Sequence, residues 1–198
     1  MFIVLEGIDG SGTTTQTKKL TEFFKKINKP VYQTCEPTSG VIGDFCRKNL
    51  AKKQISPMAL QFLFVADRIE HAEKIILPQL LEKKIIISDR YFWSTIAYSG
   101  LFCQEKFFGK IFQNSKIFPQ PDLTIFLNCS PEIAFSRIIE RKKKFEIFEN
   151  KKLLQKISQQ YLKIFQKLPP QKILKIDGDK DESAIFKIIK NFLTQKFF

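Results

Sequence analysis

Five short apolar segments alternate along the chain with longer stretches in which apolar residues recur at helical spacing. The apolar segments are Phe2 to Leu5, Val31 to Thr34, Ile85 to Ser88, Leu123 to Leu127 and Ile173 to Ile176. Nearly continuous apolar strands are typical of a parallel sheet that is buried on both faces. The stretches between them predict helices on both sides of that sheet. We therefore expect an α/β fold with three layers, in which helices flank a five-stranded parallel sheet.

Sequence signals mark where several helices begin. Ser-Pro pairs at positions 56–57 and 130–131 place a capping hydroxyl before a first-turn proline, and Asp181 precedes a further amphipathic stretch. Between the fourth and fifth strands, residues 141–150 interrupt the helical pattern and begin with four basic residues, which predicts a mobile charged lid. No repeat or linker is visible, so residues 1–198 are expected to form a single domain.

The stretch from Gly7 to Thr14 joins the first strand to the first helix. Its glycines at positions 7, 10 and 12 allow the backbone to curl with N–H groups turned inward, in front of the positive end of the helix. This predicts a P-loop that cradles a polyphosphate, with Gly7, Gly12 and the metal-side hydroxyl of Thr14 in the expected places. Thr13 stands where the pattern has lysine, so a simple strand-to-helix turn stays open at this point.

The bulk composition is that of a folded soluble protein. Of 198 residues, 43% are hydrophobic and 27% are charged, and no apolar run is long enough to span a bilayer. The chain begins directly with a strand, which favours a cytoplasmic protein without a targeting leader. The four cysteines lack metal-like spacing and are expected to be buried or idle thiols without disulfides.

The net charge of +13 does not by itself indicate a nucleic-acid partner. Lysines are scattered along every predicted helix, and only five of the 33 basic residues are arginine. We expect at most a weak, salt-sensitive affinity for nucleic acid. The arginines matter more, because their planar fork matches phosphates and base edges. Arg90 lies in Asp89-Arg90-Tyr91, directly after the third strand, at the edge where parallel sheets bind ligands, and Asp89 is placed to orient a metal.

Three separated motifs resemble the thymidylate kinase family, in order and over nearly the whole chain. Residues 2–12 resemble its P-loop, Phe62 to Arg68 its base-binding helix, and Asp89 to Tyr91 with Ser94 to Tyr98 its monophosphate motif. In the second motif, Phe64 and Arg68 are four residues apart and share one helix face, so a stacking ring and a donor fork can meet the same base. The fold is then expected to be of the P-loop NTPase type.

The resemblance implies transfer of a phosphoryl group from ATP to dTMP, giving dTDP, with Mg²⁺ and in a homodimer. The residues it implies for ATP are Gly7, Ile8, Asp9, Gly10, Ser11, Gly12, Thr13 and Thr14. Those it implies for dTMP are Asp9, Arg47, Phe64, Arg68, Arg90, Thr95 and Ser99. Those it implies for the metal are Thr14, Asp9 and Asp89, and those for catalysis are Asp9, Arg90, Arg141, Lys143 and Lys144.

The missing P-loop lysine keeps alternatives open. Gly10 stands where some relatives have arginine and Ile147 where a lid arginine is common, so Arg141 and the three lysines after it are expected to supply the positive charge. A non-catalytic nucleotide-binding relative, a kinase for another pyrimidine monophosphate and a nucleic-acid binder are the other hypotheses. His71 is expected to be a solvated or capped residue rather than a catalyst.

Overall fold

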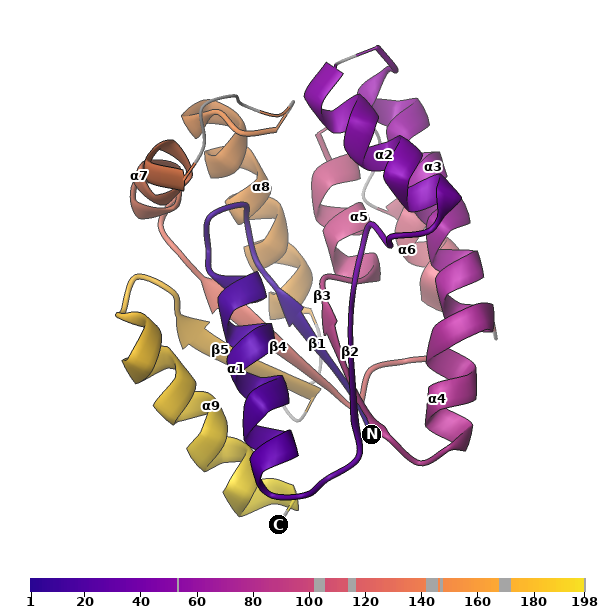
Figure 1. Ribbon diagram of the computed structural model, residues 1–198. Helices are drawn as coiled ribbons and strands as arrows, with labels where there is room; N and C mark the ends of the chain where they lie inside the picture. The colour runs from indigo at the N-terminus through magenta and orange to yellow at the C-terminus, as the bar shows by residue number, and fades with distance from the viewer. Residues whose placement is uncertain are drawn as a thin grey trace.

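The computed structural model describes residues 1–52, 54–101, 106–113, 117–141, 146, 148–167 and 172–197. Helices connect the strands, and a five-residue π-helix, η1, joins two of the helices (Figure 1). In chain order the elements are β1 (Phe2–Glu6), α1 (Thr13–Lys26), β2 (Val31–Cys35), α2 (Val41–Lys52), α3 (Pro57–His71), η1 (Ala72–Ile76), α4 (Leu77–Leu81), β3 (Ile85–Asp89), α5 (Phe92–Ser99), α6 (Lys106–Gln113), β4 (Leu123–Asn128), α7 (Pro131–Arg141), α8 (Lys151–Gln166), β5 (Ile173–Asp177) and α9 (Glu182–Phe197).

All five strands run parallel in one sheet, in the order β2-β3-β1-β4-β5. The central strand β1 pairs with β3 on one side and with β4 on the other, and Leu5 is opposite Asp89. Because parallel strands end at the same edge of a sheet, this register brings the glycine loop after β1 beside the Asp89-Arg90-Tyr91 segment at the end of β3. The sheet confirms the predicted α/β fold.

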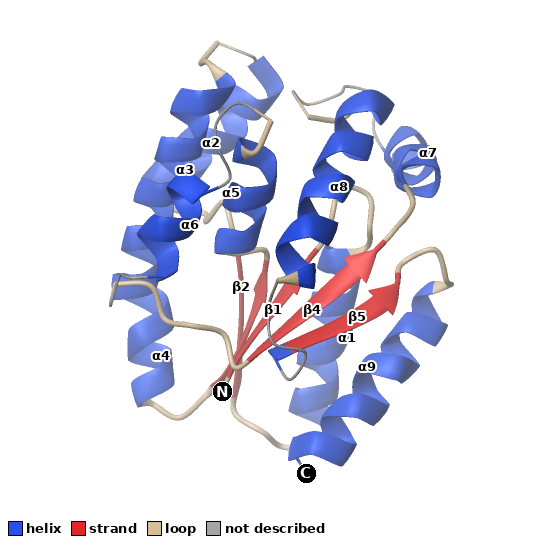
Figure 2. Ribbon diagram, turned by 180° about the vertical axis from the view of Figure 1, so that it is seen from behind, coloured by secondary structure: helices blue, strands red, loops and turns tan. Residues whose placement is uncertain are grey.

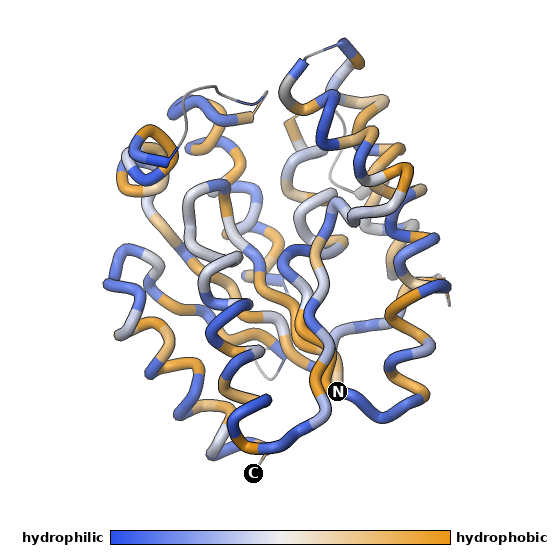
Figure 3. Tube along the Cα trace, viewed as in Figure 1, coloured by the Kyte–Doolittle hydropathy of each residue, from blue (hydrophilic) through white to orange (hydrophobic). Residues whose placement is uncertain are grey.

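Helices cover both faces of the sheet. Helices α1 and α9 lie on one face, and α3, α5 and α8 lie on the other (Figures 1 and 2). In β1, Ile3 and Leu5 pack with α1 and α9, whereas Phe2 and Val4 pack into the opposite cluster. The central strands β1, β3 and β4 are therefore mostly apolar (Figure 3) and almost fully buried, while the edge strands β2 and β5 are partly exposed.

The sequence placed all five strands correctly but ended each one residue early. The added residues at the C-terminal ends are Glu6, Cys35, Asp89, Asn128 and Asp177. They are mostly polar and lie at the edge where ligands bind, so the apolar pattern alone could not include them. The helix starts are confirmed, since Ser56 Oγ accepts from the N–H of Ala59 and Asp181 Oδ1 accepts from the N–H of Ala184.

Two expectations about the rest of the chain can be compared with the structure. Cys35, Cys46 and Cys129 are free thiols, as predicted, although Cys35 is exposed; Cys103 lies outside the described residues. No helix in the described ranges is long and apolar enough to cross a membrane.

Two glycines shape the loop after β1. Gly10 (φ 84°) and Gly12 (φ 97°) both adopt the left-handed conformation that favours glycine. A Cβ atom on Gly10 would lie 2.2 Å from the carbonyl oxygen of Ala134, so the loop packs directly against α7. A Cβ atom on Gly12 would meet nothing within 4 Å, so this part of the loop borders open space.

Candidate functional site

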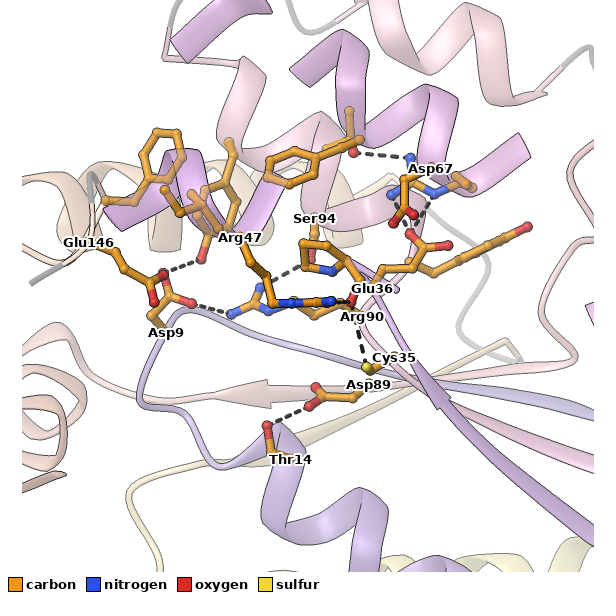
Figure 4. Close-up of a pocket in the computed structure, with 18 of the residues that line it drawn as sticks. Asp9, Thr14, Cys35, Glu36, Arg47, Asp67, Asp89, Arg90, Ser94 and Glu146 are labelled. Atoms are coloured by element: carbon orange, nitrogen blue, oxygen red, sulfur yellow. Dashed lines mark hydrogen bonds and ion pairs between the residues drawn. The ribbon is translucent and has the colours of Figure 1, made fainter. Parts of the chain in front are cut away.

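A cavity of about 490 Å³ lies at the C-terminal ends of β1, β2 and β3 (Figure 4). This volume is within the range of small-molecule binding sites. Helices α3 and α5 and the loops after the three strands contribute its walls. Its lining includes three arginines and five acids: Arg47, Arg68, Arg90, Asp9, Glu36, Asp67, Asp89 and Glu146.

Arg90 ties the end of β3 to the glycine loop. Its Nη2 atom lies 2.6 Å from Asp9 Oδ1, and its Nη1 atom donates to the carbonyl oxygen of Gly7 at 2.9 Å. Burial lowers the pKa of Arg90, but Tyr98 and Asp9 outweigh it and hold that pKa well above its ordinary value. The backbone of Arg90 has φ 72°, which is rare for a residue with a side chain. A permanently charged fork is thus held in a strained position at the cavity wall.

Glu6, at the end of β1, is a carboxylate with no exposed surface. It accepts hydrogen bonds from the N–H of Tyr91 at 2.9 Å, the hydroxyl of Ser94 at 2.6 Å and the hydroxyl of Tyr161 at 2.9 Å. Burial raises the pKa of Glu6 to about 7, although the hydrogen bond from Ser94 and the charge of Arg90 act in the opposite direction. Glu6 therefore fastens α5 and α8 to the central strand, a role that sequence reasoning missed.

Arg68, on α3, is only 2% exposed and shares its carboxylate partner with a histidine. Its Nε and Nη2 atoms lie 2.8 and 2.6 Å from Glu36 Oε2, and its Nη1 atom donates to Thr95 Oγ1 at 3.0 Å. His71 Nδ1 lies 2.9 Å from the other Glu36 oxygen, and its Nε2 atom lies 2.6 Å from Thr34 Oγ1. The expectation of a solvated His71 is wrong, because the ring is buried between two partners.

The loop after β2 is fixed to α2 and α3. Asp67 accepts from the backbone N–H of Thr38 at 2.8 Å and from its hydroxyl at 2.6 Å. Arg47 donates to the carbonyl oxygen of Pro37 at 2.7 Å and pairs with Asp44. The Arg47 side chain lines the cavity and is 39% exposed, so its fork remains accessible to an anion.

Thr14 and Asp89 meet where the first helix faces the end of β3 (Figure 4). Thr14 Oγ1 donates to Asp89 Oδ2, while Asp89 Oδ1 is buried without a hydrogen-bond partner among the described residues. These oxygen donors fit Mg²⁺, which commonly takes one or two protein carboxylates and completes its shell with phosphates and water. The described part of the chain offers no group of three or more His, Cys, Asp or Glu side chains that could hold a metal alone.

Several predicted site residues are not brought to the cavity. Of the eight glycine-loop residues, Asp9 and Thr14 line it, whereas Thr13 is only 5% exposed and does not. The expectation that Ser99 lines the dTMP site is wrong. Ser99 is fully buried, and its hydroxyl donates to the carbonyl oxygen of Ile96 instead of facing the cavity. Lys18, one turn after Thr14, does line it.

The segment 141–150 contributes an acid and an aromatic ring to the cavity. Glu146 and Phe148 line it, and Arg141 lies outside, 3.9 Å from the buried carboxylate of Glu149. The predicted catalytic residues Lys143 and Lys144 lie outside the described residues.

Comparisons with known proteins agree on one family. A family model described as thymidylate kinase matches residues 5–189. A protein of Methanococcus aeolicus named a probable thymidylate kinase is 37% identical over 201 residues, covering 98% of this chain and 97% of its own. Another with that name, from Pyrococcus horikoshii, is 38% identical and covers 87% and 86%. The thymidylate kinase of Brachyspira hyodysenteriae is 34% identical and covers 98% and 93%.

Glu6→Gln should flatten the pH dependence of stability. The folded protein keeps a proton on Glu6 (pKa about 7) that the unfolded chain releases near the ordinary glutamate pKa of 4.5. The Glu6 contribution is therefore complete below pH 4.5 and is lost as the pH rises to about 7. At about 1.4 kcal/mol per pKa unit, the loss is on the order of 3 kcal/mol.

Denaturant unfolding at about pH 5 and about pH 7.5, on either side of most of this titration, measures the change. The test is the difference between the two pH values, because the substitution itself can change absolute stability. Glu22→Gln, on the exposed face of α1, serves as the control and should behave like the natural protein. An equally steep loss in Glu6→Gln would contradict the assignment.

Proposed function

Because this chain belongs to the thymidylate kinase family, we propose that it transfers the γ-phosphoryl group of ATP to dTMP, giving dTDP and ADP. The observation that carries this proposal is one cavity with two differently held arginines. Arg68 is buried beside Phe64 on α3, and Arg90 faces the glycine loop after β3. One fork is thus available to the edge of a base, and the other to a phosphate.

The acceptor nucleotide would lie between these two arginines. Phe64 offers a ring for stacking on the base, and Arg68 with Thr95 offers polar groups to its edge. Arg90 and the accessible fork of Arg47 would hold the phosphate, each already oriented by a carboxylate. Asp9 positions Arg90 and accepts from the hydroxyl of Tyr98 at 3.0 Å, so it joins the phosphate end of the acceptor site to α5.

The donor phosphates would occupy the glycine loop, where the backbone N–H groups and the start of α1 favour anions. Thr14 and Asp89 would hold Mg²⁺, with Asp9 nearby, and the ion would neutralise charge on the phosphates. A phosphate oxygen of dTMP forms the new bond to the γ-phosphorus, and the bond from that phosphorus to the β–γ bridging oxygen breaks. The chain contributes alignment and positive charge more than covalent chemistry.

Arg68→Ala and Arg90→Ala should separate recognition of the base from recognition of the phosphate. Losing a charged hydrogen-bond donor typically costs about 1.5–3 kcal/mol. We expect Arg68→Ala to reduce the preference for dTMP over other monophosphates at least tenfold, and Arg90→Ala to abolish use of all of them. Values of kcat/KM for dTMP, dUMP and dCMP measure both effects.

Two further variants serve as controls for that comparison. Arg68→Lys keeps a positive charge beside buried Glu36 in case Arg68→Ala does not fold. Arg137→Ala removes an arginine that bonds the carbonyl oxygen of Gly178 outside the cavity, and should leave selectivity unchanged. Equal losses of selectivity in the Arg68 and Arg90 variants would refute the assignment.

The lid lysines are proposed to replace the missing P-loop lysine. The loss of one charge-stabilising donor typically costs about a hundred- to a thousandfold in rate. Changing Lys142, Lys143 and Lys144 together to alanine should lower kcat more than tenfold with little change in the KM for dTMP, and Thr13→Lys should restore part of the loss. Steady-state kinetics of ADP release test this.

Changing Lys25, Lys26 and Lys29 to alanine alters the net charge equally at the opposite end of α1, and serves as the control. Full activity in the lid variant would exclude lid compensation. Binding of ATP and dTMP without formation of dTDP would instead favour a non-catalytic nucleotide-binding protein.

We also propose a cytoplasmic homodimer. Both the location and the dimer are what membership of the family suggests. Nucleic acid is not proposed as a partner. Light scattering should give twice the chain mass of 23.1 kDa, and a mass near that of one chain would contradict the dimer.

A further inference from the structure

Gln61 is a buried amide without a hydrogen-bond partner in the described part of the chain. Its side chain is 0% exposed, and both Oε1 and Nε2 are without a hydrogen-bond partner among the described residues. Buried amides are normally bonded, because leaving donor and acceptor unpaired is costly. Gln61 also lines the cavity described above, so a bound ligand can supply both partners.

The position of Gln61 on α3 points to the base end of the cavity. Gln61, Phe64 and Arg68 are spaced i, i+3 and i+7, which places them on one face of the helix, and all three line the cavity. A ring stacked on Phe64 would therefore have Arg68 toward one end of its edge and Gln61 toward the other.

Arg68 and Thr95 offer hydrogen-bond donors to the base, so the N3–H group of thymine still requires an acceptor, which Gln61 can supply. A guanidinium has five N–H donors and no acceptor, and three of those of Arg68 are used by Glu36 and Thr95. Thr95 Oγ1 already accepts from Arg68, so its hydroxyl is free to present its own hydrogen. The N3–H group of thymine needs an acceptor, and its flanking carbonyl oxygens need donors.

We propose that Gln61 is a base-reading residue for the pyrimidine monophosphate. Its Oε1 atom accepts from the imide N3–H group, while its Nε2 atom donates to a neighbouring carbonyl oxygen, so one amide matches two adjacent positions of the base. Arg68 can only donate, so it requires a carbonyl oxygen at the position of the base that it meets. This inference rests on the proposed function.

Gln61→Leu tests the inference by changing affinity and stability in opposite directions. In the absence of nucleotide, the variant should be as thermally stable as the natural protein or more so, because an unpaired amide is replaced by an apolar group of similar size. Its affinity for dTMP should fall at least tenfold, because the N3–H group would then be buried without its acceptor. Calorimetric titration with dTMP alone measures the affinity, and ATP binding should be unchanged.

N3-methyl-dTMP provides a second readout that a purely structural role would not change. The natural protein should prefer dTMP over this analogue strongly, and Gln61→Leu should reduce that preference at least tenfold. Gln160→Leu is the matched control, since Gln160 Oε1 is also buried without a described partner but the residue does not line the cavity. That control should bind dTMP and the analogue as the natural protein does.

The outcomes separate this inference from the proposed function. If the natural protein binds dTMP and Gln61→Leu binds it equally well, or keeps the full preference over the analogue, Gln61 is not a base reader while the kinase proposal stands. If Gln61→Leu loses affinity only together with a large loss of thermal stability, a structural role replaces the inference. If the natural protein binds no monophosphate, the proposed function and this inference both fail.

Discussion

A carboxylate buried at the end of the central strand is the interaction on which the site depends. Glu6 collects hydrogen bonds from the backbone before α5, from Ser94 within it and from Tyr161 on α8, so three elements distant in sequence meet at one group. A buried polar group with several donors is satisfied in only a few arrangements. Ser94 also accepts a hydrogen bond from Arg90 at the cavity wall. The position of Arg90 therefore depends on contacts that are made in the core.

The arginines of the cavity follow one common arrangement, in which an acid orients each fork before any ligand is present. Asp9 holds Arg90, Glu36 holds Arg68 and Asp44 holds Arg47. A flexible side chain that is already ordered loses less entropy on binding, so affinity is gained without additional contacts. The cost is that each carboxylate partly neutralises the charge that a phosphate would meet. The remaining cations around the nucleotide must then supply more of the attraction.

The sequence was sufficient for the α/β class and for the five strands, because apolar patterning is encoded locally and repeats along the chain, whereas the strand order and register come from the structure. It also located Arg90 at the cavity, because a parallel sheet brings its strand ends to one edge, whereas Phe64 and Arg68 on α3 were assigned to it by the family resemblance. Sequence reasoning missed Glu6, Glu36, His71 and Gln61. These are single polar residues in or beside apolar segments, and their roles depend on partners distant in the sequence. Ser99 was misplaced because its short hydroxyl reaches its own helix backbone first.

The close approach of Gly10 to the carbonyl oxygen of Ala134 has a mechanical consequence for the segment after α7. The glycine loop and the first turn of that helix are in backbone contact, with no side chain between them to yield. The chain that follows α7 therefore continues from a helix whose first turn is held against the glycine loop by direct backbone contact.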